Sequence, residues 1–197
     1  MAKRKDGTFK VSPGTTLWTC FTSDFFIEEA DDWRQEAWEM MKSRPDISFV
    51  FVTKRIHRAN LCLPTDWEKG YDNVTIYCTV ENQRQAELRL PLFGKLPARH
   101  KGIICEPILE VVNLKPWLGN GIEHVIVGGE SGDNARPCNF DWVIQIRKDC
   151  IGSHVPFTFK QTGANFIKDD KHYWIARKDQ MPQARKANMD YHPQISI

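Results

Sequence analysis

One pattern recurs along the chain and restricts the folds that it can adopt: a short apolar run that ends in charged or polar side chains. Such runs occupy residues 18–26, 49–55, 74–82, 102–107, 124–132 and 155–163. Apolar runs of this length are typical of strands buried on both faces, as in parallel sheets. The pattern therefore predicts strands whose ends carry functional groups.

Helical patterns separate these runs. Residues 28–32 are acidic, which favours a helix start, and helical spacing then continues to Pro45, with Trp33 and Trp38 expected in the core. Strands that alternate with helices predict an α/β fold, with a mainly parallel sheet of about six strands and right-handed crossover helices. Periodicity leaves open whether this sheet closes into a barrel.

Further helices are expected near residues 58–61 and after two capping residues, Asn82 and Asp141. We expect a polar lead-in over residues 1–16 and one barrel-like domain over 17–165. Residues 166–197 carry many charges and show no clear strand, so they are expected to form an irregular or helical tail.

Composition excludes several classes of protein. The net charge of +2, from 27 basic and 25 acidic side chains, argues against a dominant nucleic-acid footprint but leaves room for a local basic patch. No apolar run approaches the ~20 residues that cross a bilayer, and the basic N-terminus lacks the apolar region of a signal peptide. We therefore expect a cytoplasmic protein.

The cysteines and histidines form no metal-binding motif. None of the six cysteines is paired at C-x-x-C spacing, so free and partly buried thiols are expected. Cys20, Cys78 and Cys105 lie in or at the ends of predicted strands, which keeps a spatial cluster open as a hypothesis. The histidines are scattered, and G-x-S-x-G, Walker A and G-x-G-x-x-G patterns do not occur, so serine hydrolase, P-loop and Rossmann functions lack support.

The candidate site lies where the predicted strands end. The carboxyl ends of parallel strands meet at one edge of a sheet, and ligands bind at that edge. The polar side chains expected there are Asp24, Lys54, Arg55, Glu81, Glu106, Glu130, Ser131, Arg136, Lys160 and Gln161. Gly128 and Gly129 have no side chains at a strand end, so a ligand or another backbone could approach closely. The alternative is that they form an ordinary turn.

These residue types allow several chemistries. Carboxylates such as Glu81, Glu106 and Glu130 could bind ribose hydroxyls or an ammonium group, or act as an acid and base pair. Paired cations such as Lys54 and Arg55 could hold a carboxylate or a phosphate. The purely structural alternative is that cations and carboxylates around one mouth neutralise each other. The spacing does not choose among these hypotheses.

Six short motifs, taken in order, resemble a known family. They are Ser-Asp-Phe-Phe at 23–26, Thr-Lys-Arg at 53–55, Val-Glu-Asn at 80–82, Cys-Glu-Pro at 105–107, Gly-Gly-Glu-Ser-Gly at 128–132 with Ala-Arg-Pro at 135–137, and Phe-Lys-Gln-x-Gly at 159–163. Together they resemble the phage-associated, radical-SAM-like family of uncharacterised proteins. The resemblance implies a partial, open TIM-type (β/α) barrel and an S-adenosylmethionine site across the strand ends. The expected contacts to this cofactor come from Gly128, Gly129 and Glu130 or their neighbours Ser131, Glu81 and Glu106.

The chain departs from this family in one respect. The resemblance implies an N-terminal three-cysteine motif that holds a [4Fe–4S] cluster, but no cysteine lies among the 17 residues before Trp18. Without three thiolates the cluster lacks its usual ligands. One hypothesis is that the chain is the C-terminal portion of a radical-SAM-type enzyme and is inactive as written.

The missing three-cysteine motif also allows other hypotheses. The chain could be a cluster-less relative that binds a nucleotide or nucleic acid, or an acid/base enzyme that uses Glu81, Glu106 or Glu130, so the enzyme assignment stays open. A barrel without its first strand exposes a sheet edge, which predicts a homodimer through that edge, or instability.

Overall fold

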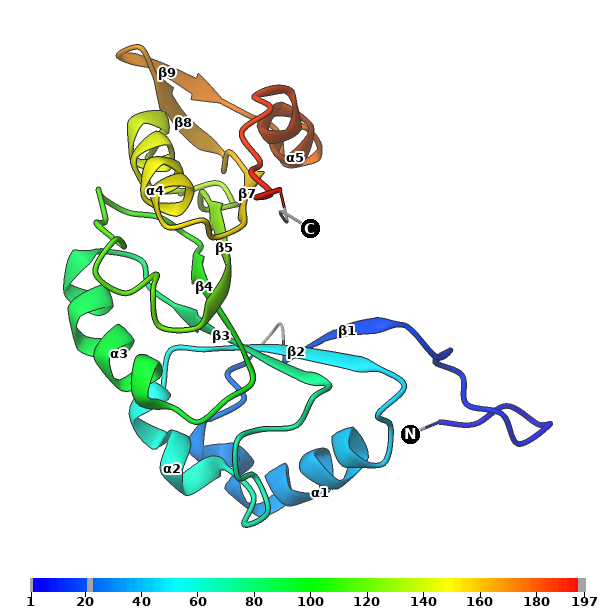
Figure 1. Cartoon of the computed structure of the whole chain (residues 1–197). Helices are drawn as coiled ribbons and strands as arrows, with labels where there is room; N and C mark the ends of the chain where they lie inside the picture. The colour runs from blue at the N-terminus through cyan, green and yellow to red at the C-terminus, as the bar shows by residue number, and fades with distance from the viewer. Residues whose placement is uncertain (1, 21–22, 195–197) are drawn as a thin grey trace. The chain divides into compact units, whose positions relative to one another are not determined.

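Strands and helices alternate along the chain as the sequence pattern predicts (Figure 1). The structure is a computed structural model that describes residues 2–20 and 23–194. It divides into two compact units: unit 1 comprises Met1–Tyr77 and Leu96–Lys101, and unit 2 comprises Cys78–Lys95 and Gly102–Ile197. The domain boundaries predicted at residues 16 and 165 stay predictions.

Six parallel strands form the main sheet, in the order β1-β2-β3-β4-β5-β7. Their bounds are Thr16–Thr19 (β1), Ser48–Thr53 (β2), Val74–Thr79 (β3), His100–Cys105 (β4), Ile122–Gly128 (β5) and Phe157–Gln161 (β7). Successive strands of this sheet are neighbours, as in a (β/α) barrel, and β1 and β7 form the two open ends of the order. The predicted α/β class, with a parallel sheet and an open, partial barrel topology, is confirmed.

Helices connect the strands. Their bounds are Glu28–Ala30 (η1) with Asp31–Lys42 (α1), Ile56–Arg58 (η2) with Ala59–Cys62 (α2), Gln83–Lys95 (α3), Phe140–Gly152 (α4) and Arg177–Lys186 (α5). Asn82 caps α3 as predicted, since its Oδ1 accepts the Gln85 N–H at 2.9 Å. The cap of α4 is Asn139 and not Asp141: Asn139 Oδ1 accepts the Asp141 N–H, so Asp141 lies in the first turn.

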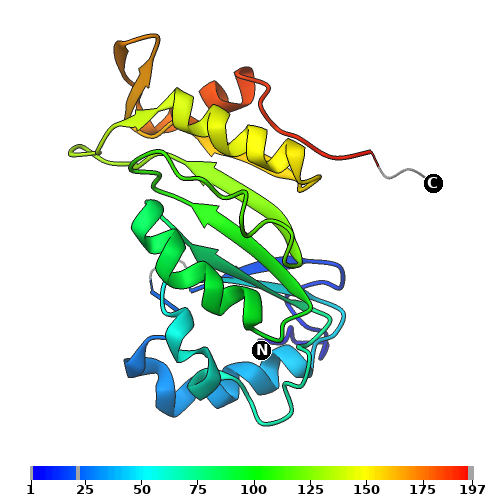
Figure 2. The same cartoon turned by 60° about the vertical axis from the view of Figure 1, so that its left-hand side comes forward.

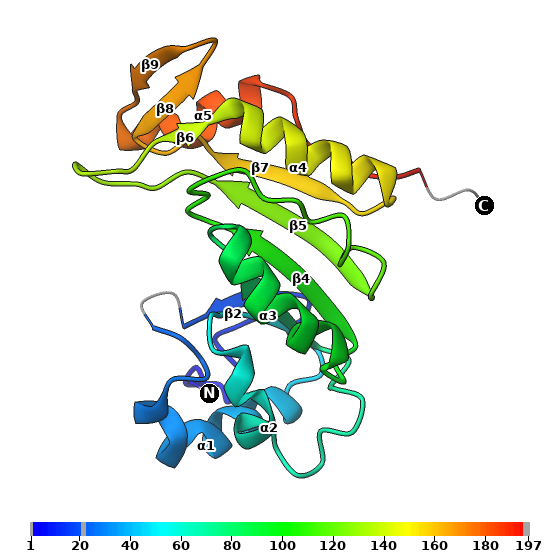
Figure 3. The ribbon, with the colours of Figure 1, turned by 90° about the vertical axis from the view of Figure 1, so that its left-hand side faces the viewer.

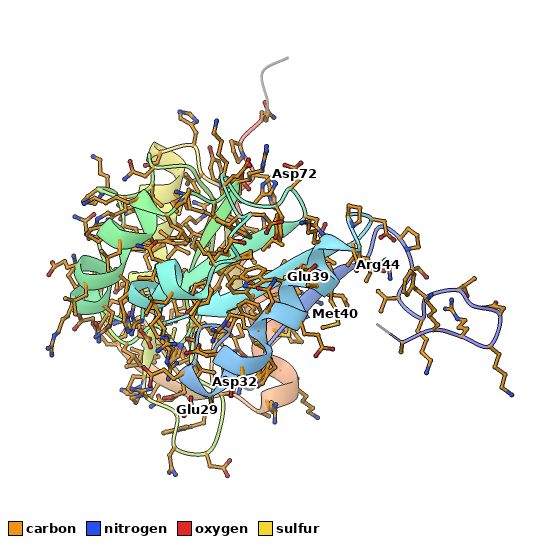
Figure 4. The ribbon with its side chains drawn as sticks, turned by 90° about the horizontal axis from the view of Figure 1, so that it is seen from below. Glu29, Asp32, Glu39, Met40, Arg44 and Asp72 are labelled. Atoms are coloured by element: carbon orange, nitrogen blue, oxygen red, sulfur yellow. The ribbon has the colours of Figure 1, made fainter. Side chains whose placement is uncertain are left out.

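The inner face of α1 differs from the expected one. Trp38 is buried as predicted, but the expectation that Trp33 lies in the core is wrong, because its side chain is 53% exposed. Arg34 takes the inward position instead, since its guanidinium donates to the Phe25 carbonyl at 2.9 Å and to that of Ile27. Asp32, labelled on α1 in Figure 4, is exposed to solvent.

The first apolar run folds differently from the prediction. A strand was expected over 18–26, but β1 ends at Thr19, and Cys20 adopts a left-handed conformation with φ of 59°. Residues 21–22 of this run lie outside the described residues. Phe25 and Phe26 are buried without being in a strand, and Phe25 stacks on Phe51 of β2 with ring centroids 4.3 Å apart. Burial of the two rings therefore produced the apolar pattern.

A second, small sheet was not predicted. It consists of β6 (Cys138–Asn139), β8 (Asn165–Lys168) and β9 (Lys171–Trp174), with β8 and β9 forming an antiparallel hairpin. The expectation that the tail contains no strand is wrong, whereas its helical part corresponds to α5. Asp169 and Asp170 both have positive φ, as a two-residue hairpin turn requires. Polar residues dominate this hairpin, so its apolar pattern is weak.

The open edge at β1 keeps the dimer hypothesis as a prediction. β1 ends the strand order, and its Trp18 is 36% exposed while its ring lies 5.4 Å from that of Tyr77.

Among the residues described, no helix is long and apolar enough to cross a membrane.

We expect His124 to make unit 2 less stable in mild acid. Burial lowers the pKa of this imidazole on β5 below 6.5, and nearby His192 lowers it further. The unfolded chain therefore binds this proton at a higher pH than the folded chain, so the stability present above about pH 6.5 is lost as the pH falls through the folded pKa.

Urea unfolding at about pH 7 and about pH 5 tests this effect. His124→Gln should lose less stability between the two pH values than the unaltered protein, whereas the exposed His172→Gln should lose the full amount. An equal loss in both variants would show that other groups cause the acid sensitivity. His124 Nε2 lies 3.0 Å from Thr158 Oγ1, a contact that glutamine can replace.

Candidate functional site

The predicted strand-end residues of unit 2 lie at or after the ends of β3, β4, β5 and β7. Figure 3 shows the arrowheads of β4, β5 and β7 pointing the same way, so the residues that follow them lie at one edge of the sheet. We call this set the strand-end rim. It consists of Glu81, Glu106, Glu130, Ser131, Arg136, Lys160 and Gln161.

Glu106, directly after β4, contacts two other rim residues. Its side chain is only 14% exposed, and its Oε2 accepts a charged hydrogen bond from Lys160 Nζ at 2.8 Å. Its Oε1 accepts from the Gln161 amide. Gly128 lies against the same carboxylate, since a Cβ there would stand 3.0 Å from Glu106 Oε1. The Glu106–Pro107 peptide bond is cis.

Ser131 extends this network to helix α5. Its hydroxyl lies 3.0 Å from Gln161 Oε1 and 2.9 Å from Gln180 Oε1. A hydroxyl has one proton, so at any moment it donates to only one of these carbonyl oxygens. The Gln180 amide nitrogen donates to the Ile175 carbonyl, which fixes its oxygen toward Ser131. Gln180 is 1% exposed and was not predicted, because only the packing of α5 places it here.

Glu130 and Arg136 close the loop after β5. The Arg136 guanidinium donates Nε to Glu130 Oε2 at 2.8 Å and Nη2 to Oε1 at 2.7 Å, a two-pronged pairing. The Arg136 backbone N–H also donates to Oε2. The two predicted residues are thus brought together, with Arg136 half exposed and Glu130 partly covered.

Glu81 has a partner that the sequence analysis missed. Arg89 of α3 donates Nη1 to Glu81 Oε2 at 2.7 Å and to the Thr79 carbonyl at 2.6 Å. Glu81 itself is 9% exposed. An arginine two turns into the helix that follows a strand-end carboxylate was the available signal, because a long side chain on that helix can reach back to the strand.

The glycines at the end of β5 admit another backbone. A Cβ on Gly129 would stand 2.2 Å from the Thr162 carbonyl oxygen, and the Gly129 N–H donates to the Gln161 carbonyl at 3.0 Å. On the facing loop Gly163 has φ of +77°, and a Cβ there would stand 2.8 Å from the Glu130 nitrogen. Of the two partners expected to approach here, the structure places a backbone against Gly129.

Asp24, Lys54 and Arg55 form a separate cluster in unit 1. Asp24 Oδ1 accepts from the Thr53 hydroxyl at 2.7 Å and from the Phe26 N–H at 2.9 Å, while Oδ2 accepts from the Lys54 N–H at 2.7 Å. The Arg55 guanidinium lies 3.2 Å from Oδ2. The sequence left open that cations and carboxylates around one mouth neutralise each other, and Arg55 does so with Asp24.

The chain matches a protein family over residues 4–192, and that family is described as "Protein of unknown function (DUF5131)". The chain belongs to this family. No curated protein and no solved structure matches the chain. The description of DUF5131 assigns no activity.

The thiols of this DUF5131 member do not fit an iron–sulfur cluster. Cys62, Cys78, Cys105, Cys138 and Cys150 are buried. Burial raises the pKa of Cys138 and of Cys150 to about 12. Within residues 2–20 and 23–194, no three His, Cys, Asp or Glu side chains are grouped to hold a metal ion, which includes the set Cys20, Cys78 and Cys105.

We expect at most one thiol of the native DUF5131 protein to react quickly with a disulfide reagent. Cys20 is the partly exposed cysteine, although burial raises its pKa as well. Titration of the native protein with the reagent should therefore show one thiol per chain that reacts at a fast or moderately slow rate. After unfolding in urea, all six thiols should react. Cys20→Ser should remove the early equivalent. Several fast thiols in the native protein would contradict the burial of the other five.

Proposed function

We propose that the strand-end rim binds S-adenosylmethionine or a similar adenosyl compound, as expected for a protein related to radical-SAM enzymes. The observation that supports this most is Glu106, a shielded carboxylate at the carboxyl end of a barrel strand that already holds an ammonium group, that of Lys160, at 2.8 Å. Ligand sites in (β/α) barrels lie at this end of the strands. The amino group of the ligand would bind the same carboxylate.

The neighbouring amides add a preference for a hydroxyl or ammonium donor. Ser131 is exposed and has one proton for two carbonyl oxygens, those of Gln161 and Gln180. When Ser131 donates to the buried Gln180, the Gln161 oxygen can accept a hydrogen bond from a ligand, and the ribose hydroxyls of an adenosyl group are suitable donors. Glu130 contributes less to such a site, since a two-pronged arginine pairing and a backbone N–H hold its carboxylate, whereas one lysine and one amide hold Glu106.

The proposal is limited to binding by this chain's own residues. The described cysteines do not fit a [4Fe–4S] cluster, so no step of the proposed function runs through one. The phage-associated, radical-SAM-like origin rests on the resemblance of the six sequence motifs. Nucleic acid is less suited to the rim, because the cations Lys160 and Arg136 are paired with Glu106 and Glu130.

Calorimetric titration with S-adenosylmethionine tests the proposal. The unaltered protein should bind with a dissociation constant below about 1 mM. Glu106→Gln should weaken binding roughly 10- to 100-fold, because a hydrogen bond to a charged group is lost. The matched control is Glu29→Gln, which alters an exposed carboxylate outside the rim.

The outcomes are distinct. Absence of heat at millimolar ligand, or equal affinity in Glu106→Gln and Glu29→Gln, would overturn the proposal. Competition by methionine alone or by adenosine alone would identify which half of the ligand the rim holds. Ser131→Ala should weaken adenosine more than methionine, since its hydroxyl belongs to the amide network.

A further inference from the structure

A second surface of unit 2 combines aromatic and cationic side chains. It is a groove of about 700 Å³ between the start of α4, strand β7, the β8–β9 hairpin and α5. Figure 2 shows the hairpin beside the N-terminal end of α4. We call it the hairpin groove, and the residues that matter here are Phe140, Phe166, Lys168, Tyr173, Trp174 and Lys186.

Packed aromatic rings form the floor of the hairpin groove. Phe140 lies 5.8 Å from Phe166 and 6.1 Å from Phe159 between ring centroids, and Phe159 and Phe166 are buried. Lys168 Nζ stands 5.4 Å from the centroid of Phe140, which is within cation–π distance. This contact draws the ammonium group of Lys168 toward the floor.

Two aromatic side chains at the border of the groove remain open to water. Tyr173 is 44% exposed and Trp174 is 69% exposed, although both line the groove. The hairpin register pairs Tyr173 with Phe166, so alternation along the strands puts Phe166, Lys168 and Tyr173 on one face. Trp174 belongs to the other face by the same alternation, and it lines the groove as the last residue of β9. Exposed rings beside a cation form a surface that favours a partner with flat π-faces.

The charge of the groove indicates which charge that partner carries. Lys168, Lys186 and His172 line it, and no acidic residue is among the described residues that do so. An anionic partner with flat rings matches both properties. Nucleic acid bases stack on aromatic side chains, while their phosphates bind lysines.

We propose that the hairpin groove binds single-stranded nucleic acid, with bases stacked on Tyr173 and Trp174 and phosphates near Lys168 and Lys186. A duplex suits the groove less, because its bases are already stacked on each other and present only their edges. The net charge of the chain is only +2, so stacking should supply much of the affinity. This inference goes beyond the proposed function, since it uses none of the rim residues.

Fluorescence anisotropy with a labelled oligothymidylate of roughly 12 nucleotides tests the proposal on the full chain. Trp174→Ala and Tyr173→Ala should each raise the dissociation constant about ten-fold, as the loss of one stacked base does. Trp33→Ala, which removes a similarly exposed tryptophan of α1, should leave it unchanged. Both groove positions are exposed, and circular dichroism will verify that the variants are folded.

The salt dependence separates the lysine contacts from stacking. Lys168→Ala should reduce the slope of log affinity against log salt by about 0.7, the value for one phosphate contact on a single strand. Lys148→Ala alters an exposed lysine on α4 that does not line the groove, so it should keep the slope.

Four results would overturn the inference: no binding at low salt, equal binding by Trp174→Ala and Trp33→Ala, equal affinity for a duplex of the same length, or equal competition by free thymidine monophosphate. The last would assign the groove to small nucleotides. The test is independent of the rim, because Trp174→Ala should keep its response to S-adenosylmethionine and Glu106→Gln should keep its affinity for the oligonucleotide.

Discussion

Gly129→Ala is expected to lower the free energy of unfolding by about 3 kcal/mol or more. A Cβ at this position would stand 2.2 Å from the Thr162 carbonyl oxygen and 2.7 Å from its carbonyl carbon, so the backbone of one segment must move. The shift would also strain the hydrogen bond from the Gly129 N–H to Gln161. For a chain of this size the melting temperature should fall by roughly 6–12 °C.

The matched control for this change is Gly152→Ala. Gly152 ends α4, and no atom lies within 4 Å of a Cβ built there, so alanine should leave stability unchanged or raise it by up to about 1 kcal/mol. Equal melting temperatures for the two variants would mean that the loop after β7 can move away from β5. Because Gln161 holds Glu106, Gly129→Ala should also weaken S-adenosylmethionine binding if the proposed function is correct.

Asp24→Ala is expected to destabilise unit 1 by about 2–5 kcal/mol. The carboxylate accepts hydrogen bonds from the Phe26 N–H and the Thr53 hydroxyl, and those two residues are 0% and 1% exposed. Truncation therefore leaves buried donors without an acceptor. It also removes the ion pair with Arg55.

Urea unfolding followed by tryptophan fluorescence measures this loss, because Trp38 packs on Phe25 in the same unit. Asp24→Asn keeps an acceptor oxygen without the charge and should lose only part of the stability. Asp32→Ala, at the exposed start of α1, should cost less than about 1 kcal/mol. If Asp24→Ala costs no more than Asp32→Ala, the turn at residues 23–26 does not depend on its carboxylate.

The two clusters of strand-end residues have different consequences for function. In unit 1 the carboxylate of Asp24 is largely enclosed by donors from its own turn and from the end of β2, which makes it a structural group. In unit 2 Glu106 binds Lys160, whose side chain is 39% exposed and can yield to a ligand. The rim is therefore the better candidate for binding.

The sequence by itself determined the alternation of strands with helices and the residue types at the strand ends. Strands buried on both faces of a parallel sheet must be apolar, so runs such as 49–55 and 124–132 marked β2 and β5 directly. Asn82 was recognisable as a cap because capping depends on residues adjacent in the chain.

Only the tertiary structure decided which charged and polar side chains contact each other. The partners of Glu81, Glu106 and Ser131 are Arg89, Lys160 and Gln180, and each comes from another element of the fold. Local periodicity carries no information about the pairs of Glu106 and Ser131, because their partners lie 54 and 49 residues away and depend on how helices and strands pack. For the same reason the polar β8–β9 hairpin escaped prediction: its cross-strand pairing and its contact with α4 favour strands in a segment whose own apolar pattern is weak.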